Sequence, residues 1–97
     1  MSLKIINITD KKGIVCKIFA TTFKEISQIE RYKDKFIFEV FDVEDVETME
    51  LVDKHKLKHV PTILIFDKNN NLIETFIGCA CKSELIEFLD KKIEEES

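Results

Sequence analysis

The sequence predicts an α/β sandwich with a mixed sheet. Short runs rich in β-branched and aromatic residues alternate with longer segments of helical periodicity, and an asparagine-rich turn joins the last two strand-like runs. The expected order is strand, helix, strand, helix, strand, strand, helix, so two strand–helix–strand steps precede a hairpin and a closing helix. The 97 residues contain no linker, repeat or low-complexity tract, so we expect a single domain over residues 1–97.

The composition narrows the classes of function. With 44% apolar and 35% charged residues and a formal charge of -4, the chain reads as an ordinary globular protein. Its lysines alternate with glutamates, so we expect no nucleic-acid partner. No apolar run approaches a membrane span and the N-terminus lacks a secretory segment, so we expect no membrane association. The odd count of three cysteines favours reduced thiols in a cytoplasmic location.

The first half of the chain contains a strand and a long helix. Residues Lys4 to Ile8 ("KIINI") predict a strand. From Gly13 to about Tyr32 the apolar residues recur in steps of three and four, as on one face of a helix. In an alternative interpretation, "GIVCKIFA" is a second strand and a shorter helix starts at Thr21. We favour the long helix because the periodicity persists through both halves; its apolar positions are Val15, Ile18, Phe19, Phe23, Ile26, Ile29 and Tyr32.

The middle of the chain predicts a second strand and a second helix. The strand is the aromatic-rich run from Phe36 to Phe41, and the helix runs from Val43 to Lys56 with acidic residues at its positive end. We expect His55 on the solvated side of this helix. Its apolar face is expected to carry Val46, Met49, Leu51 and Val52.

The last part predicts a hairpin followed by a helix. Thr62 to Phe66 is a fully apolar strand, "DKNNN" is a turn, and Leu72 to Ile77 is the return strand. The closing helix is expected from Lys82 to Ile93, with Leu85, Ile86, Phe88 and Leu89 on one face. The tail "EEES" is expected to be frayed and solvated.

Residues 38 to 93 carry a resemblance to a known family. They contain a Val-Pro-Thr turn, an apolar strand, an asparagine-rich hairpin, a strand ending in glycine and a helix with an L-x-x-F-L face. This segment resembles the second half of a thioredoxin, and the element order is that of the minimal thioredoxin fold, a four-stranded mixed sheet flanked by three helices. The matching residues are Val60, Pro61, Thr62, Ile63 to Phe66, Gly78, Leu85, Phe88 and Leu89.

The resemblance implies that the Val60–Pro61 bond is cis. In thioredoxin-like proteins this proline stands beside the catalytic cysteine, and the residue before it offers backbone hydrogen bonds to a substrate peptide. Cis X-Pro bonds are otherwise uncommon, about 5–6% in folded proteins. The alternative is a trans proline at the start of a strand.

The same resemblance implies that the usual Cys-x-x-Cys pair is incomplete. The segment opposite the proline reads "KKGIVCK", so Cys16 takes the second cysteine position and Gly13 takes the first. Dithiol exchange needs a thiolate that attacks and a second thiol that resolves the mixed disulfide, and glycine supplies neither. The buried acid of the family aligns with Asn7 and its lysine partner near Val40. Ordinary dithiol–disulfide oxidoreductase activity is therefore not expected.

Two further cysteines, Cys79 and Cys81, lie in "GCACK" between the last strand and the last helix. Cys81 falls near the helix N-terminus, which favours a thiolate, so it could be a redox-active thiol or form a disulfide between Cys79 and either Cys81 or Cys16. We favour the simpler interpretation that both fill space, as small hydrophobic residues do. His59 is expected on the same face, but the C-x-C spacing is tighter than in structural zinc motifs, so neither a metal nor a cofactor is expected.

Two functions remain open. The favoured one is a protein-binding or redox-accessory module that docks a protein or peptide partner in an apolar groove around the proline. The alternative is an atypical thiol–disulfide oxidoreductase, acting in cell redox homeostasis, that uses Cys16 with Cys79 or Cys81. The groove residues are expected to be Gly13, Ile14, Val15, Val60, Pro61 and Gly78.

Overall fold

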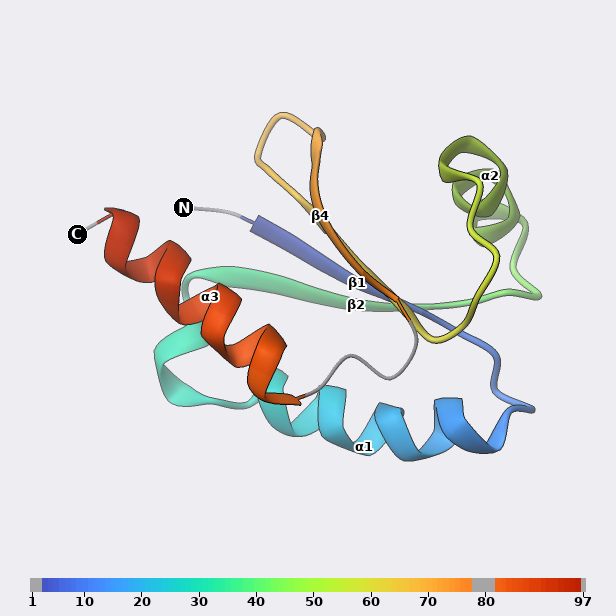
Figure 1. Ribbon diagram of the computed structural model, residues 1–97, viewed down its shortest axis with the longest axis horizontal. Coiled ribbons are helices and arrows are strands. Elements are labelled where there is room, and N and C mark those ends of the chain that lie inside the picture. The colour runs from blue at the N-terminus through green and yellow to red at the C-terminus, as the bar shows by residue number, and fades with distance from the viewer. Residues whose placement is uncertain (1–2, 78–81, 97) are drawn as a thin grey trace.

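The computed structural model describes residues 3–77 and 82–96 (Figure 1). Four strands and three α-helices follow one another in the predicted order, and a short 3-10 helix lies between α1 and β2. The elements are β1 (Leu3–Thr9), α1 (Ile14–Ser27), η1 (Glu30–Tyr32), β2 (Phe36–Asp42), α2 (Val46–His55), β3 (Thr62–Phe66), β4 (Leu72–Ile77) and α3 (Lys82–Glu96).

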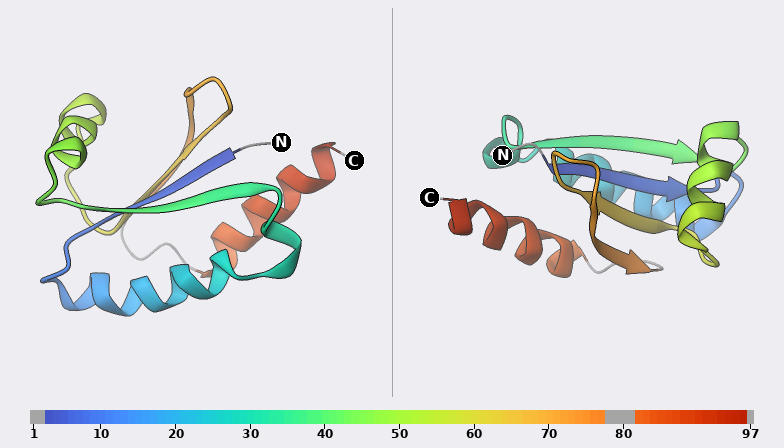
Figure 2. Two further views of the ribbon diagram at one scale, coloured as in Figure 1. Left: turned by 180° about the vertical axis from the view of Figure 1, so that it is seen from behind. Right: turned by 90° about the horizontal axis from the view of Figure 1, so that it is seen from above.

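The strands form one mixed sheet in the order β2-β1-β3-β4. Strands β1 and β2 run parallel, whereas β3 is antiparallel to both β1 and β4. Helices α1 and α3 lie along one face of the sheet and α2 packs against the other (Figures 1 and 2). The predicted fold class, a thioredoxin-like α/β sandwich, is confirmed.

Alternate residues of the central strands divide the core into two layers. On the face covered by α1 and α3, β1 contributes Ile5 and β3 contributes Ile63 and Ile65. On the opposite face Ile6 and Leu64 belong to the cluster beneath α2. Successive side chains of a strand point to opposite faces, so both central strands must be apolar at nearly every position. This is why they read as continuous apolar runs in the sequence.

Helix α1 is confirmed in place of the alternative strand, but it ends at Ser27. The amides of Gln28 and Ile29 bond to carbonyls only three residues back, at 3.2 and 3.1 Å, and Ile29 then turns to an extended conformation before η1. The buried face consists of Cys16, Phe19, Phe23 and Ile26.

The prediction that Val15 and Ile18 lie on the buried apolar face of this helix is wrong. Both side chains are exposed, by 49% and 65% respectively. The spacing of Cys16, Phe19 and Phe23 already fills one helical face, and Val15 and Ile18 fall beside it.

Helix α2 is shorter than predicted because the turn after β2 uses Val43 to Asp45. The Asp42 carboxylate accepts the amide of Glu44 at 2.9 Å, and the Asp42 carbonyl accepts that of Asp45 at 3.0 Å. Val46 and Met49, expected on the core face, are exposed. The other two residues predicted on this face, Leu51 and Val52, do pack against the sheet, and Thr48 is buried as well.

The prediction that His55 is solvated is also wrong. Its ring lies 5.7 Å from that of Phe66, between centroids, and its Nε2 atom is enclosed by protein. Helix α2 ends just beyond it at Lys56, in the left-handed conformation with φ 52°. This C-terminal cap directs the chain back across the sheet toward β3.

The hairpin and the last helix follow the predicted pattern closely. The Asp67 carboxylate accepts the amides of Asn69 and Asn71, at 2.8 and 2.9 Å, and Asn70 takes the left-handed conformation with φ 64°. Helix α3 continues to Glu96, beyond its predicted end at Ile93. Within residues 3–77 and 82–96, no helix combines the length and apolar character needed to cross a membrane.

A polar cluster joins η1 to α3 at the edge of the core. The Asp90 carboxylate accepts two bonds from Arg31, at 2.7 and 3.0 Å, and one from the Tyr32 hydroxyl at 2.7 Å. Burial of the Tyr32 phenol and its bond to Asp90 raise the pKa of Tyr32 to about 12. The bonds from Arg31 lower the pKa of Asp90, which stays charged at neutral pH.

Asn7 is a buried polar residue of β1 and lies on the same face of the strand as Ile5. Its side chain is fully buried, and neither its amide nitrogen nor its oxygen has a hydrogen-bond partner among the described residues. A buried polar group without a partner costs about 1–3 kcal/mol.

The Tyr32 cluster predicts a loss of stability at alkaline pH. Above pH 10 the exposed phenol of the unfolded chain ionises, while the folded phenol stays protonated until about pH 12, so the free energy of unfolding falls as pH rises through this range. Tyr32→Phe should be less stable than wild type by about 1.5 kcal/mol at pH 7, and this difference should shrink above pH 10. Urea denaturation of both proteins at pH 7 and above pH 10 measures this difference in the free energy of unfolding. A difference that stays constant would contradict the raised pKa of Tyr32.

Asn7→Val should raise the free energy of unfolding by about 1–2 kcal/mol, because it removes two unpartnered polar atoms from the core. Asn7→Asp should lower it, since a carboxylate would then be buried without a partner. Urea denaturation of both variants tests the pair. Equal or lower stability of the valine variant would show that the amide is satisfied in solution.

Candidate functional site

Three chain segments meet at one end of the sheet. In the strand register, Ile8 of β1 lies beside Thr62 of β3, and Thr62 lies beside Ile77 of β4. Pro61 immediately precedes this row, and the segment leading to α1 leaves β1 just after it at Thr9. The register therefore brings the proline turn to the end of the sheet from which α1 begins.

The proline turn is tightly closed. The Val60–Pro61 peptide bond is cis, the isomer expected from the sequence, and Pro61 is buried. The Thr62 hydroxyl donates a hydrogen bond of 2.5 Å to the carbonyl of His59, across the turn. Val60 projects outward and is 38% exposed.

Gly13 and Cys16 occupy the first turn of α1. Gly13 is the N-cap, with an extended backbone (φ −84°, ψ 133°), and its carbonyl accepts the amide of Lys17 at 3.0 Å. Cys16 is only 3% exposed, and its Sγ accepts the amide of Asp10 at 3.4 Å. The one thiol among the described residues therefore lies on the inner face of the helix and already bonds to the backbone.

The backbone geometry at Gly13 and Cys16 would suit a disulfide, but Gly13 has no sulfur atom. A Cβ atom added to Gly13 would lie 3.6 Å from the Cβ of Cys16 and 3.5 Å from its Sγ. Disulfide-bonded cysteines have Cβ atoms about 3.5–4.5 Å apart. The backbone of the first helical turn thus has the arrangement that a Cys-x-x-Cys pair requires.

The loop before α1 is held by acidic residues that the sequence interpretation missed. The Asp42 carboxylate, at the end of β2, accepts the amide of Lys11 at 3.0 Å. Glu44 pairs with Lys12 at 2.9 Å and with Lys11 at 3.5 Å. The amides of Glu44 and Lys11 lower the pKa of Asp42, so this carboxylate is charged across the neutral range. The aspartate at the end of the predicted strand was the sequence signal that could have indicated this contact.

Asn7 and Val40 are the residues that the resemblance placed where the family has a buried acid and its lysine partner. The two lie opposite each other in the register between β1 and β2. Val40 is exposed and Asn7 is buried, and neither side chain can exchange a proton at neutral pH. This pair cannot act as an acid–base relay.

Apolar side chains are exposed around the proline turn. Ile14 and Ile18 on α1 are 77% and 65% exposed, and Ile77 at the end of β4 is 65% exposed. Single exposed apolar residues are ordinary, but several at one end of the sheet suggest a binding surface. Val15 and Val60 add to this set.

Three predicted site residues, Gly78, Cys79 and Cys81, lie outside the described residues. The disulfides considered for them therefore remain predictions. Among residues 3–77 and 82–96, no three histidine, cysteine, aspartate or glutamate side chains are grouped so that they could hold a metal ion.

Comparison with known proteins agrees with this geometry. The family model of thioredoxin matches residues 12–91. Thioredoxin of Buchnera aphidicola subsp. Acyrthosiphon pisum (strain APS) is 35% identical over 78 residues, which cover 80% of this chain and 68% of that protein.

Solved structures show the same fold. The germline-specific thioredoxin Deadhead of Drosophila melanogaster superposes with a TM-score of 0.79 at 22% identity, covering 93% of this chain and 80% of that one. Oxidised thioredoxin of Plasmodium falciparum gives a TM-score of 0.72 at 27% identity over the same shares. The chain belongs to the thioredoxin family.

Proposed function

We propose that this thioredoxin-family protein is a protein-binding or redox-accessory module that lacks ordinary dithiol exchange and docks a peptide segment at the cis-proline groove. The observation that carries the proposal is Gly13, which stands where a nucleophilic thiol would have to be, within disulfide distance of Cys16. The buried position of Cys16 also supports it, because an attacking thiolate must be accessible.

The backbone of Val60 supports docking by strand-like pairing. Among the described residues, neither its amide nor its carbonyl takes part in an intramolecular hydrogen bond. An extended peptide could pair with these groups and lay apolar side chains against Val60 and Ile14, which are both exposed. Main-chain bonds would supply affinity, and the apolar surface would supply specificity.

The alternative is an atypical thiol–disulfide oxidoreductase that uses Cys16 with Cys79 or Cys81. The observation that favours it is the end of β4: Ile77 lies beside Thr62, so the segment carrying both cysteines leaves the sheet from the row next to Pro61. The membership of the thioredoxin family also favours redox chemistry. Exchange would require a movement that exposes Cys16.

The docking proposal predicts binding of an unfolded polypeptide that contains no free thiol. Reduced and carboxymethylated α-lactalbumin is a suitable probe, because disulfide exchange cannot contribute. Val60→Asp should weaken its binding about tenfold, since a charge would replace apolar contact at the turn. Titration calorimetry measures the dissociation constants.

Ile73→Asp is the matched control for this experiment. Ile73 is 39% exposed, against 38% for Val60, but it lies near the start of β4, at the opposite end of the sheet. Its variant should bind as tightly as wild type. Equal losses in the two variants, or no binding by wild type, would contradict docking at the groove.

A single substitution should create dithiol activity. In Gly13→Cys the new Cβ meets no atom closer than 3.4 Å and lies at disulfide distance from Cys16, so the pair should form a disulfide and reduce insulin in the presence of dithiothreitol. We expect insulin-precipitation turnover at least about tenfold above that of wild type, because only the variant has an attacking thiol beside the resolving one.

The controls separate the two candidate functions. Gly13→Ser, which adds similar bulk without sulfur, should stay at the wild-type level, and Gly13→Cys combined with Cys16→Ser should lose the gain. If wild type itself shows turnover that disappears in both Cys16→Ser and Cys79→Ser, the oxidoreductase alternative is correct and the binding-module proposal is wrong.

A further inference from the structure

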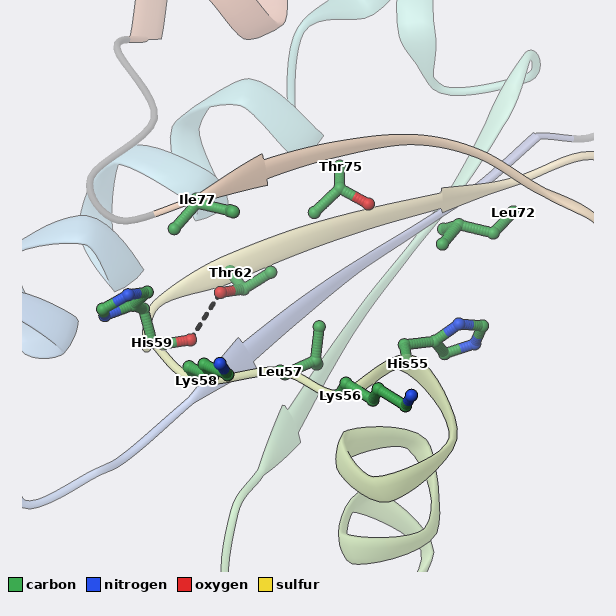
Figure 3. A pocket seen from close by; sticks show the side chains of 9 residues that line it. All are labelled: His55, Lys56, Leu57, Lys58, His59, Thr62, Leu72, Thr75 and Ile77. Carbon is green, nitrogen blue, oxygen red and sulfur yellow. Dashed lines mark hydrogen bonds between the residues drawn. The ribbon is translucent and has the colours of Figure 1, made fainter.

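A cavity lies between the sheet and the C-terminal end of α2 (Figure 3). Its volume is about 340 Å³, within the range of small-molecule sites, about 300–1,000 Å³. His59 and Ile77 lie at one end, His55 and Leu72 at the other, and Thr62 lies between them (Figure 3). The lining residues are His55, Lys56, Leu57, Lys58, His59, Thr62, Leu72, Thr75 and Ile77.

The sheet supplies one wall of this cavity. Thr62, Leu72 and Ile77 belong to β3 and β4 and share the sheet face on which α2 packs, since Ile77 pairs with Thr62 and Leu72 with Phe66. The segment between α2 and β3 supplies the opposite wall. It is set by the left-handed cap at Lys56 and by the amide of Leu57, which bonds back to Val52 at 3.0 Å.

The charge of the lining is one-sided. Lys56 and Lys58 line the cavity and no carboxylate does, although the chain as a whole has a formal charge of -4. A neighbouring cavity of about 230 Å³ adds Lys54 and Lys4, of which Lys4 is paired with Glu39 at 3.8 Å. Lys58 forms no ion pair with any described residue. Such a lining is complementary to an anion.

The lining is also amphipathic. Leu57, Leu72 and Ile77 give it an apolar part, while Lys56 and Lys58 supply ammonium groups. A ligand site of this kind is typically mostly apolar, with a few polar groups that fix orientation. The apolar part would hold a hydrocarbon body and the basic groups its charged end.

We propose that this cavity binds a small organic anion, consisting of an apolar body and one carboxylate or phosphate group. The volume of about 340 Å³ suits a small molecule better than a polypeptide segment. This inference needs neither the cysteines nor the peptide groove. It can therefore be tested independently of the proposed function.

The test uses matched probes followed by ¹H–¹⁵N spectra of the wild-type protein. Phenylbutyrate and phenyl phosphate carry the two anionic groups, and phenylbutanol has the apolar body of the former without a charge. We expect saturable shifts for an anionic probe, in the millimolar range, confined to the amides around the cavity, including Leu57, Thr75 and Ile77. The tighter of the two anions identifies the charged group.

Variants test the role of charge. Lys58→Gln should weaken binding of the preferred anion about threefold to fivefold, whereas Lys58→Arg should retain it. Lys68→Gln, an exposed lysine in the β3–β4 turn, is the matched control and should bind as wild type does. Together these results would support an anion site at the end of α2.

Three results would overturn the proposal. One is the absence of saturable shifts with both anions, and another is equal binding of phenylbutanol and phenylbutyrate. The third is a set of shifts centred on Ile14, Ile18 and Val60, which would place the probe on the exposed apolar surface.

Discussion

The antiparallel pairing of β1 with β3 is the constraint on which the rest of the structure depends. It sets Ile8 beside Thr62, and β4 continues the same row with Ile77. A shift of one residue would exchange the two faces of β3 and place Leu64 in the layer now filled by Ile63 and Ile65, so the packing of the two core layers holds the register. Because the register is fixed, the proline turn, the segment before α1 and the end of β4 must share one end of the sheet.

At that end the backbone geometry suits a pair of thiols, but Gly13 carries no sulfur atom. The first turn of α1 holds a backbone that would suit a disulfide, and the loop before it is secured by Asp42 and Glu44. Gly13 has no side chain at this position, and Asn7 is a buried amide without a hydrogen-bond partner among the described residues, which lowers the stability of the fold. The cis-proline turn and the exposed apolar side chains need no thiol, which is why we propose binding rather than exchange.

The sequence predicted the strands well because burial on both faces leaves a strong signal. The bounds of β3 and β4 match the prediction, since apolar composition and the Asp67 turn mark their ends. The helices were harder. Val15, Ile18 and Met49 satisfy helical spacing yet are exposed, because Cys16, Phe19 and Thr48, each one position away, are the buried residues. His55 was misassigned for a related reason: its burial comes from Phe66, a tertiary neighbour that helical periodicity cannot identify.

The four-residue turn from His59 to Thr62 takes part in both proposed binding surfaces, the peptide groove and the cavity beside α2. Its Val60 side faces outward beside the exposed residues of α1, whereas His59 and Thr62 line the basic cavity. The bond from the Thr62 hydroxyl to the His59 carbonyl closes the turn. A ligand on either surface would therefore contact the turn from His59 to Thr62, which also forms part of the other surface. This holds whether or not a sulfur atom is present at position 13.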